Sequence, residues 1–149
     1  MPVPPGQKKP RGAGARPSRG GFSSKLHAAG DSLGNPLAFH LTAGQQGDAP
    51  QALPLLGHRR AQAVIADKAY DADAILAAVA AGGALAVIPP RATRRDQRAI
   101  DWHLYRQRHK IENLFGFIKH YRRVFARFDK LARRYLAFVH LVAVCILLR

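Results

Sequence analysis

The chain has 149 residues, of which 48% are hydrophobic, and this length and composition suit one globular domain with a buried core. Its 24 lysines and arginines against 9 aspartates and glutamates give a net charge of +15, which favours a polyanionic partner, with nucleic acid ahead of an acidic membrane surface. The single cysteine, Cys145, excludes an internal disulfide, and the basic start lacks the apolar run of a secretory signal peptide, so we expect a cytoplasmic, DNA-associated protein.

The first segment, residues 1–21, contains no acidic residue and almost no large apolar side chain. Such a segment buries too little surface to offset the entropy of ordering, so we predict a disordered basic arm. It is either a solvated tail or a loose clamp on DNA phosphates whose binding weakens as salt rises. Residues 22–149 are predicted to form the folded domain.

Two short extended segments come next, "FSSKLHAAG" at residues 22–30 and "PLAFHLTAG" at residues 36–44. The "DSLGN" between them has the Asp, Gly and Asn of a turn, so the pair is predicted to form a β-hairpin. "DAPQALPLL", residues 48–56, then predicts a short helix with Asp48 as its N-cap and Gln51 at the capping-box position.

A strand, a helix and a second strand follow. "AVIAD" predicts a short buried strand ending at Asp67, and "DADAILAAVAAGG" predicts a helix with Asp71 capping its start and Gly82 its end. "ALAVIPP" predicts the second strand, stopped by Pro89 and Pro90. This order indicates an α/β unit with a parallel pair of strands.

The remainder is predicted to be a basic loop, "RATRRDQR" (residues 91–98), a long helix over about residues 100–124 and a final helix over about residues 130–149. The apolar run at residues 135–148 is about fourteen residues long, whereas a membrane span needs roughly twenty, so we predict a buried helix and no membrane insertion. Basic side chains of these segments are the predicted phosphate contacts, with plain solvated surface as the alternative for each. They are Arg94, Arg95, Arg98, Arg122, Arg123, Arg127, Arg133 and Arg134. For Trp102, core packing is favoured over a base-stacking platform.

The long helix holds the chain's one glutamate, Glu112, within "YRQRHKIENLFGFIK". At about 100° per residue, Tyr105, Arg108 and Lys119 fall within roughly 40° of it, beside an apolar stripe. The stripe consists of Ile111, Leu114, Phe115 and Ile118. One interpretation of the polar row is a solvated face with ordinary Arg108–Glu112 pairing. The other is a site in which Glu112 and Asp67, at the end of a parallel strand, share a divalent ion that activates water or a terminal hydroxyl for attack at phosphorus.

These residues resemble a known family. The spacing Y-x2-R-x3-E-x6-K, present as Tyr105, Arg108, Glu112 and Lys119, is similar to the signature helix of bacterial insertion-sequence transposases of the DDE type. "ADKAYDAD" resembles their second-aspartate motif, ADKGYD, with Ala69 in place of the glycine. "SRGGFSSKLHAAGDSLGNPL", "VIPPR" and "FDKLARRYLAFVHLVAVCILLR" are similar to further blocks of the family in the same order, so the resemblance covers nearly the whole chain after the basic arm.

The resemblance implies a ribonuclease-H-like α/β fold, with a mixed sheet and flanking helices, in which two aspartates and one glutamate bind two Mg²⁺ or Mn²⁺ ions. Such enzymes act as homo-oligomers on double-stranded DNA, cleaving the element's ends and joining them to target DNA. The resemblance makes Asp67 the second aspartate and Glu112 the glutamate, both metal ligands, and it implies that Tyr105, Arg108 and Lys119 position DNA or support the glutamate. The short separation of Asp67 and Glu112 matches the compact branch, which has no large β insertion.

One acid of the family's triad has no counterpart. The family's first aspartate lies on a central strand before the "SRGG" block, and residues 1–30 contain no acid. Asp31 is predicted in the hairpin turn, roughly 20 Å from the site, and Asp48 already has a predicted capping role. We therefore expect a partial catalytic domain that lacks its first strand, is poorly stable alone and is complemented by a polypeptide from an upstream reading frame. Frameshifting and gene decay both explain such a C-terminal portion, and the rival prediction is a non-catalytic basic DNA-binding remnant or regulator.

Overall fold

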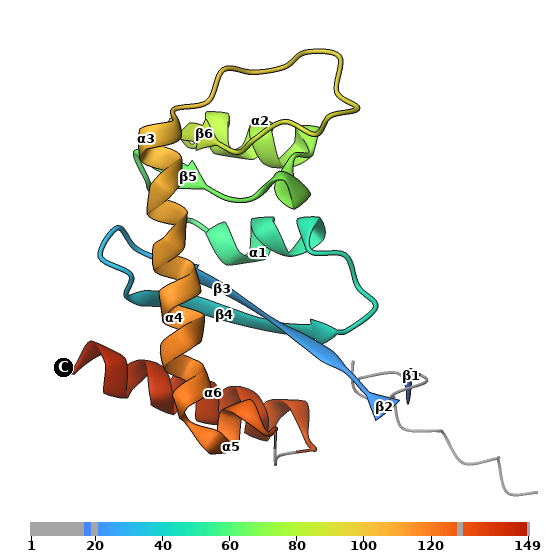
Figure 1. Cartoon of the computed structure of the whole chain (residues 1–149), viewed down its shortest axis with the longest axis vertical. Helices are drawn as coiled ribbons and strands as arrows, with labels where there is room; N and C mark the ends of the chain where they lie inside the picture. Colours follow the sequence, from blue (N-terminus) through green and yellow to red (C-terminus); the bar gives the residue numbers. More distant parts are fainter. Residues whose placement is uncertain (1–16, 19–20, 128–129, 149) are drawn as a thin grey trace, which may run out of the picture.

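The structure is a computed structural model that describes residues 17–18, 21–127 and 130–148 (Figure 1). Its strands are β1 (Pro17–Ser18), β2 (Gly21–Phe22), β3 (Ser24–Gly30), β4 (Pro36–Ala43), β5 (Ala63–Ile65) and β6 (Leu85–Val87). Its α-helices are α1 (Ala52–Leu56), α2 (Asp73–Ala81), α3 (Trp102–Tyr105), α4 (His109–His120), α5 (Arg122–Phe125) and α6 (Ala132–Leu147), and its 3-10 helices are η1 (Ala49–Gln51), η2 (Lys68–Tyr70) and η3 (Arg106–Arg108). The predicted basic arm lies mostly outside the described residues; within it β1 pairs antiparallel with β2, and its disorder stays a prediction.

The predicted hairpin is present. Strands β3 and β4 pair antiparallel, with Leu26 opposite Leu41. Asp31 shapes the turn, because its Oδ1 accepts hydrogen bonds from the backbone N–H groups of Leu33 and Asn35, both at 2.8 Å, and its Oδ2 accepts one from Asn35 Nδ2 at 3.0 Å. Burial would raise the pKa of Asp31, but these hydrogen bonds outweigh it and lower the pKa. The Asp31 carboxylate is thus engaged within the turn.

The helix after the hairpin begins as η1 and continues as α1, and the capping prediction for Asp48 is wrong. Asp48 has helical backbone angles, φ −80° and ψ −37°, and its side chain makes no cap hydrogen bond. The backbone does not offer the donors that a cap needs, since Pro50 has no N–H and the Gln51 N–H already donates to the Asp48 carbonyl at 3.0 Å. The Asp48 carboxylate instead accepts a hydrogen bond from Lys25 Nζ at 3.0 Å, which ties the helix to β3.

The predicted α/β unit is also confirmed. Strands β5 and β6 pair in parallel, with Val64 opposite Ala86, and α2 connects them. Gly82 follows the last residue of α2 as predicted, and β6 ends before Pro89. The cap prediction for Asp71 is wrong, because α2 begins two residues later, at Asp73, and the buried Asp71 carboxylate binds the loop that follows β6.

The described strands form three two-stranded sheets and not the single mixed sheet that we expected. The buried side chains accordingly fall into two clusters. The first joins α4, α5 and α6 and contacts the hairpin, and consists of Leu114, Ile118, Val124, Val139 and Val142. The second lies around α1, α2 and the parallel pair, and consists of Ala52, Ile75, Val79 and Ile88. The fold is therefore mixed α/β, with its core in two parts.

A column of helix, α3 followed by η3 and α4, runs past both parts (Figure 1). Its upper end lies beside the parallel pair, and α4 packs on β3 lower down. The predicted long helix is interrupted at Tyr121, which has an extended conformation of φ −82° and ψ 99° and packs against the first cluster. In the described part of the chain no helix is both long and apolar enough to cross a membrane. The predicted final helix is present as α6, but it is only partly buried, since Leu141 and Leu147 are more than half exposed.

Candidate active site

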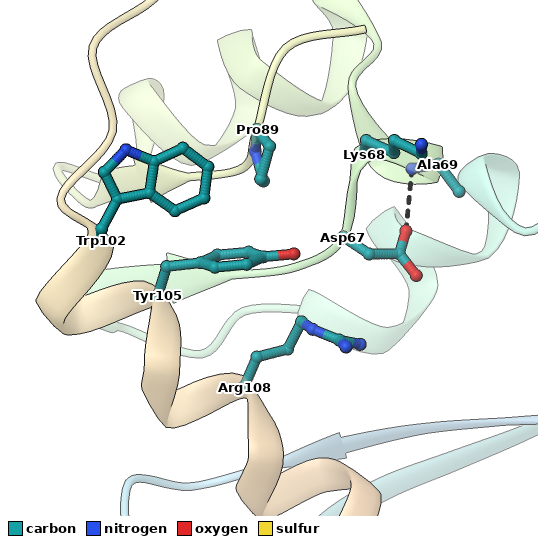
Figure 2. A pocket seen from close by; sticks show the side chains of 7 residues that line it. All are labelled: Asp67, Lys68, Ala69, Pro89, Trp102, Tyr105 and Arg108. Carbon is teal, nitrogen blue, oxygen red and sulfur yellow. Dashed lines mark hydrogen bonds between the residues drawn. The ribbon is translucent and has the colours of Figure 1, made fainter.

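A hollow of about 470 Å³ opens between the turn that follows β5 and the upper end of the helical column (Figure 2). It is lined by Asp67, Lys68, Ala69, Pro89, Trp102, Tyr105 and Arg108. Three of these residues, Asp67, Tyr105 and Arg108, were predicted as site residues from the sequence. The hollow lies at the carboxyl end of a parallel strand, where open α/β sheets usually place their active sites.

Asp67 is held by the turn that it begins. Its backbone is extended, with φ −78° and ψ 172°, and its Oδ1 accepts a hydrogen bond from the Ala69 N–H at 2.8 Å. This bond caps η2 and fixes the carboxylate in the turn that lines the hollow. Among the described residues, Arg127 is the one non-glycine residue with a positive φ, so Ala69 fits this turn without the conformational freedom of the family's glycine.

The helical column contributes the other side of the hollow. The Tyr105 hydroxyl and the Arg108 guanidinium point from the column toward the Asp67 turn (Figure 2). Arg108 Nη2 donates a hydrogen bond to Glu112 Oε1 at 2.6 Å, and its guanidinium carbon lies 6.0 Å from the centroid of the Tyr105 ring. The Glu112 side chain is 57% exposed and lies one turn farther along the helix, outside the lining of the hollow. The ordinary Arg108–Glu112 pairing therefore exists, and it also connects Glu112 to the hollow.

Lys119 is the member of the signature that lies farthest from the hollow. It is exposed in the last turn of α4, seven residues beyond Glu112 and thus about 10 Å farther along the helix axis. At that distance Lys119 can extend a surface for DNA but does not touch the hollow.

The carboxylates described here do not make a complete divalent-cation site. In the residues that the structure describes, no three His, Cys, Asp or Glu side chains come close enough to hold a metal ion. Asp67 is the acid that lines the hollow, and Glu112 is paired with a guanidinium, which opposes binding of a cation until the pair opens. Oxygen ligands of this kind suit Mg²⁺, which proteins hold with few carboxylates together with phosphate oxygens and water.

Asp71 organises the basic loop beside the hollow, a role that sequence reasoning missed. Its fully buried carboxylate accepts hydrogen bonds from the Arg91 N–H at 2.8 Å, from Arg94 Nε at 2.9 Å and from Arg98 Nη2 at 2.8 Å. The Arg91 guanidinium in turn donates to the carbonyl of Ala69 at 2.8 Å. The loop and the Asp67 turn are thus fastened to each other. One indication of this role was present in the sequence, namely an aspartate at position 71 and a loop with four arginines at residues 91–98.

The predicted phosphate contacts differ in their surroundings. Arg94 is engaged by two carboxylates, since its Nη2 also lies 2.7 Å from Asp73 Oδ1, whereas Arg95 is exposed in the same loop. Arg122 and Arg123 are exposed on α5, at the other end of the column, and the Arg123 guanidinium lies 3.9 Å from the centroid of the Phe138 ring. Their contact with DNA stays a prediction.

The charge on Asp71 is expected to hold the loop closed. Burial would raise the pKa of Asp71, but the Arg91 N–H and the guanidiniums of Arg98 and Arg94 outweigh it and lower the pKa to about 2. Because this folded-state pKa lies below the ordinary value of 3.8, the stabilisation is present above about pH 4 and is lost as the pH falls toward 2. It amounts to about 2 kcal/mol.

We therefore predict that Asp71→Asn opens the loop at neutral pH. Trypsin cleavage after Arg94 and Arg95 should become roughly ten- to thirtyfold faster, because cleavage follows the population of the open loop. In the unmodified chain, protection of the Arg91 amide from hydrogen exchange should fall between pH 4 and pH 2. Asp73→Asn is the matched control, because the Asp73 side chain is exposed and its pair with Arg94 contributes little. Equal cleavage rates in Asp71→Asn and the control would contradict this role.

Comparison with known proteins shows the family of the chain. The sequence matches the family model of the transposase DDE domain over residues 1–148. It is 44% identical over 130 residues to a protein of Brucella ovis named "Putative transposase for insertion sequence element IS6501", covering 86% of this chain and 100% of that protein. It is 32% identical over 130 residues to a Burkholderia cepacia protein named "Putative transposase for insertion sequence element IS402", covering 79% of this chain and 59% of that protein. No solved structure matches the chain. The chain therefore belongs to the DDE transposases of insertion sequences, a family whose function is DNA transposition.

Proposed function

We propose that this chain supplies the second aspartate and the glutamate of an enzyme that cleaves the ends of an insertion sequence and joins them to target DNA. The observation that carries the proposal is the convergence of Asp67, Tyr105 and Arg108 on one hollow, with Glu112 held by Arg108 one helical turn away. Asp67 comes from a strand end and the other three from a helix about forty residues later, so the fold itself unites two motifs that the sequence keeps apart.

Each side chain at the hollow has a task that its chemistry suits. The Arg108 guanidinium has the planar set of donors that binds a phosphate group, and the Tyr105 hydroxyl can donate a hydrogen bond to a phosphate oxygen. Asp67 and Glu112 are the acids that would hold the divalent ions at the reacting phosphate. Lys119 and the exposed arginines Arg95, Arg122 and Arg123, with Arg94 where the loop opens, would contact the DNA backbone and make binding strongly salt-dependent.

We propose that a third carboxylate comes from a further segment of polypeptide. We infer that it lies on a strand between β3 and β5, each of which has one edge without a strand partner among the described residues. Such a strand would join the hairpin and the parallel pair into one ribonuclease-H-like mixed sheet and would connect the two core clusters. With its aspartate in place, the assembled enzyme would hold two Mg²⁺ or Mn²⁺ ions, which in this family activate the attacking hydroxyl. An upstream-frame polypeptide is the proposed source, and we expect the active form to be a homo-oligomer on DNA in the cytoplasm.

Strand transfer by the chain extended with its upstream coding sequence tests this function. The substrate is a labelled duplex carrying the element's end, incubated with a target plasmid and Mg²⁺ or Mn²⁺. Joined product that disappears when EDTA is added is the expected result. Salt-sensitive DNA binding without any joined product, with either ion, would instead identify a DNA-binding protein that has no catalytic activity.

A further inference from the structure

Trp102 stands at the rim of the hollow and not in the core. It is the one tryptophan of the chain, and its side chain is 60% exposed although it lines the same hollow as Asp67 and Arg108. The expectation that Trp102 packs in the core is therefore wrong. An indole that stays in water beside a candidate site exposes a large aromatic surface that a ligand can cover.

The ring is nevertheless held in place. Asp101 caps α3 by accepting a hydrogen bond from the Leu104 N–H at 2.9 Å, which fixes Trp102 as the first residue of the helix. The indole meets the Tyr105 ring edge to face, with centroids 5.5 Å apart and an interplanar angle of 87°. Figure 2 shows Trp102 and Tyr105 on the helical side and Pro89 across the hollow from them. The hollow thus has an ordered aromatic and apolar part.

The lining divides by chemistry into two parts. Trp102, Tyr105 and Pro89 offer flat or apolar surface, whereas Lys68 and Arg108 bring positive charge next to Asp67. A nucleotide of a DNA strand has the matching halves, a base with an apolar π-face and an anionic phosphate. A volume of about 470 Å³ falls within the range of sites that hold such a ligand.

We propose that Trp102 stacks on one unpaired base of the DNA strand whose phosphate lies at Arg108 and Asp67. Stacking on an exposed aromatic ring contributes enough to offset much of the few kcal/mol needed to take one base out of a duplex. The contact accepts any base, because every base has a π-face. It would fix the strand at the hollow through a base, while the cations hold its phosphate. The placement of DNA at the hollow rests on the proposed function, but the stacking contact is tested without any strand transfer.

Trp102 fluorescence gives a direct readout, because the chain has no other tryptophan. The probes are a single-stranded tetranucleotide of deoxyadenosine and the same sugar-phosphate tetramer without bases. Both should bind through charge, measured by competition against a fluorescein-labelled strand. The tetranucleotide with bases is expected to quench Trp102 saturably and to bind roughly tenfold more tightly, whereas the abasic tetramer should leave the emission nearly unchanged.

Variants separate stacking from charge and from folding. Trp102→Ala should lose roughly tenfold in affinity for the tetranucleotide and nothing for the abasic tetramer, and Trp102→Phe should keep most of the affinity because it keeps an aromatic face. Phe125→Ala is the matched control, since Phe125 is 68% exposed on α5, away from the hollow, and its loss should change neither affinity. Equal affinity for the two tetramers, or equal quenching by both, overturns the proposal while leaving DNA binding intact. Loss of strand transfer in the extended chain, with these differences preserved, would instead count against the proposed function alone.

Discussion

Replacing Glu112 with glutamine is expected to lower strand transfer by the extended chain by roughly a thousandfold or more, the scale found when a group that acts on the reacting atoms is removed. Glutamine keeps the shape of the side chain but removes the negative charge, and the same argument applies to Asp67→Asn. DNA affinity should change little in either variant, because both remove negative charge from a site whose DNA contacts are cationic. The measurements are the rate of joined product at saturating DNA and the dissociation constant of the same duplex.

The matched control for these acid variants is Asp96→Asn, which removes an exposed carboxylate from the basic loop. It should leave strand transfer within a fewfold of normal. Glu112→Gln also breaks the pair with Arg108, so a drop in DNA affinity as large as the drop in rate would indicate that this ion pair, and not the carboxylate, is what the site requires. Near-normal transfer by Glu112→Gln would contradict the assignment outright.

Addition of the strand proposed between β3 and β5 is expected to change the stability of the chain more than any single substitution in it. Two-stranded sheets are marginal in water, and β3 and β5 both have backbone groups without a strand partner in the described fold. The chain alone should therefore unfold gradually on heating. With the upstream polypeptide at about a hundred times its dissociation constant, the free energy of unfolding should rise by about 3 kcal/mol, which corresponds to a rise in Tm of roughly 10 °C. The unfolding transition should also become cooperative.

A strand peptide with a proline at its centre is the control, because proline removes a ladder hydrogen bond and should abolish the rise in Tm. Circular dichroism at 222 nm follows both experiments. A sharp transition of the chain alone at high temperature, unchanged by the upstream polypeptide, would show that the two core clusters do not need a strand between them.

Local patterns in the sequence predicted the elements that position the site. The hairpin and the parallel pair were recognised because their apolar runs are bounded by turn residues and prolines. The common face of Tyr105 and Arg108 followed from the helical period. The 3-10 turn of η3 keeps it, because side chains three residues apart lie on the same side of a 3-10 helix. The place of Asp67 at a strand end followed from the order of the elements along the chain.

The expectations that failed depend on partners far apart in the sequence. Asp48 and Asp71 both have the residue type and spacing of helix caps, yet their carboxylates bind Lys25 and the arginines of the loop after β6, about twenty residues away. Tryptophan is a residue type that often packs in a core, but the residues next to Trp102 in the sequence do not indicate which side of α3 faces the hollow. The division into three two-stranded sheets and two core clusters is visible only in the packing.

Mapping of the metal site in the extended protein tests the central claim most directly. Fe²⁺ can replace Mg²⁺ at carboxylate sites, and with ascorbate and peroxide it produces radicals that cut the polypeptide next to the bound ion. We expect scission near Asp67 and near Glu112, and also near the aspartate that the upstream segment supplies, all suppressed by excess Mg²⁺ and all lost in Asp67→Asn. Absence of scission at Asp67 and Glu112, or scission there that Asp67→Asn leaves unchanged, would contradict this assignment.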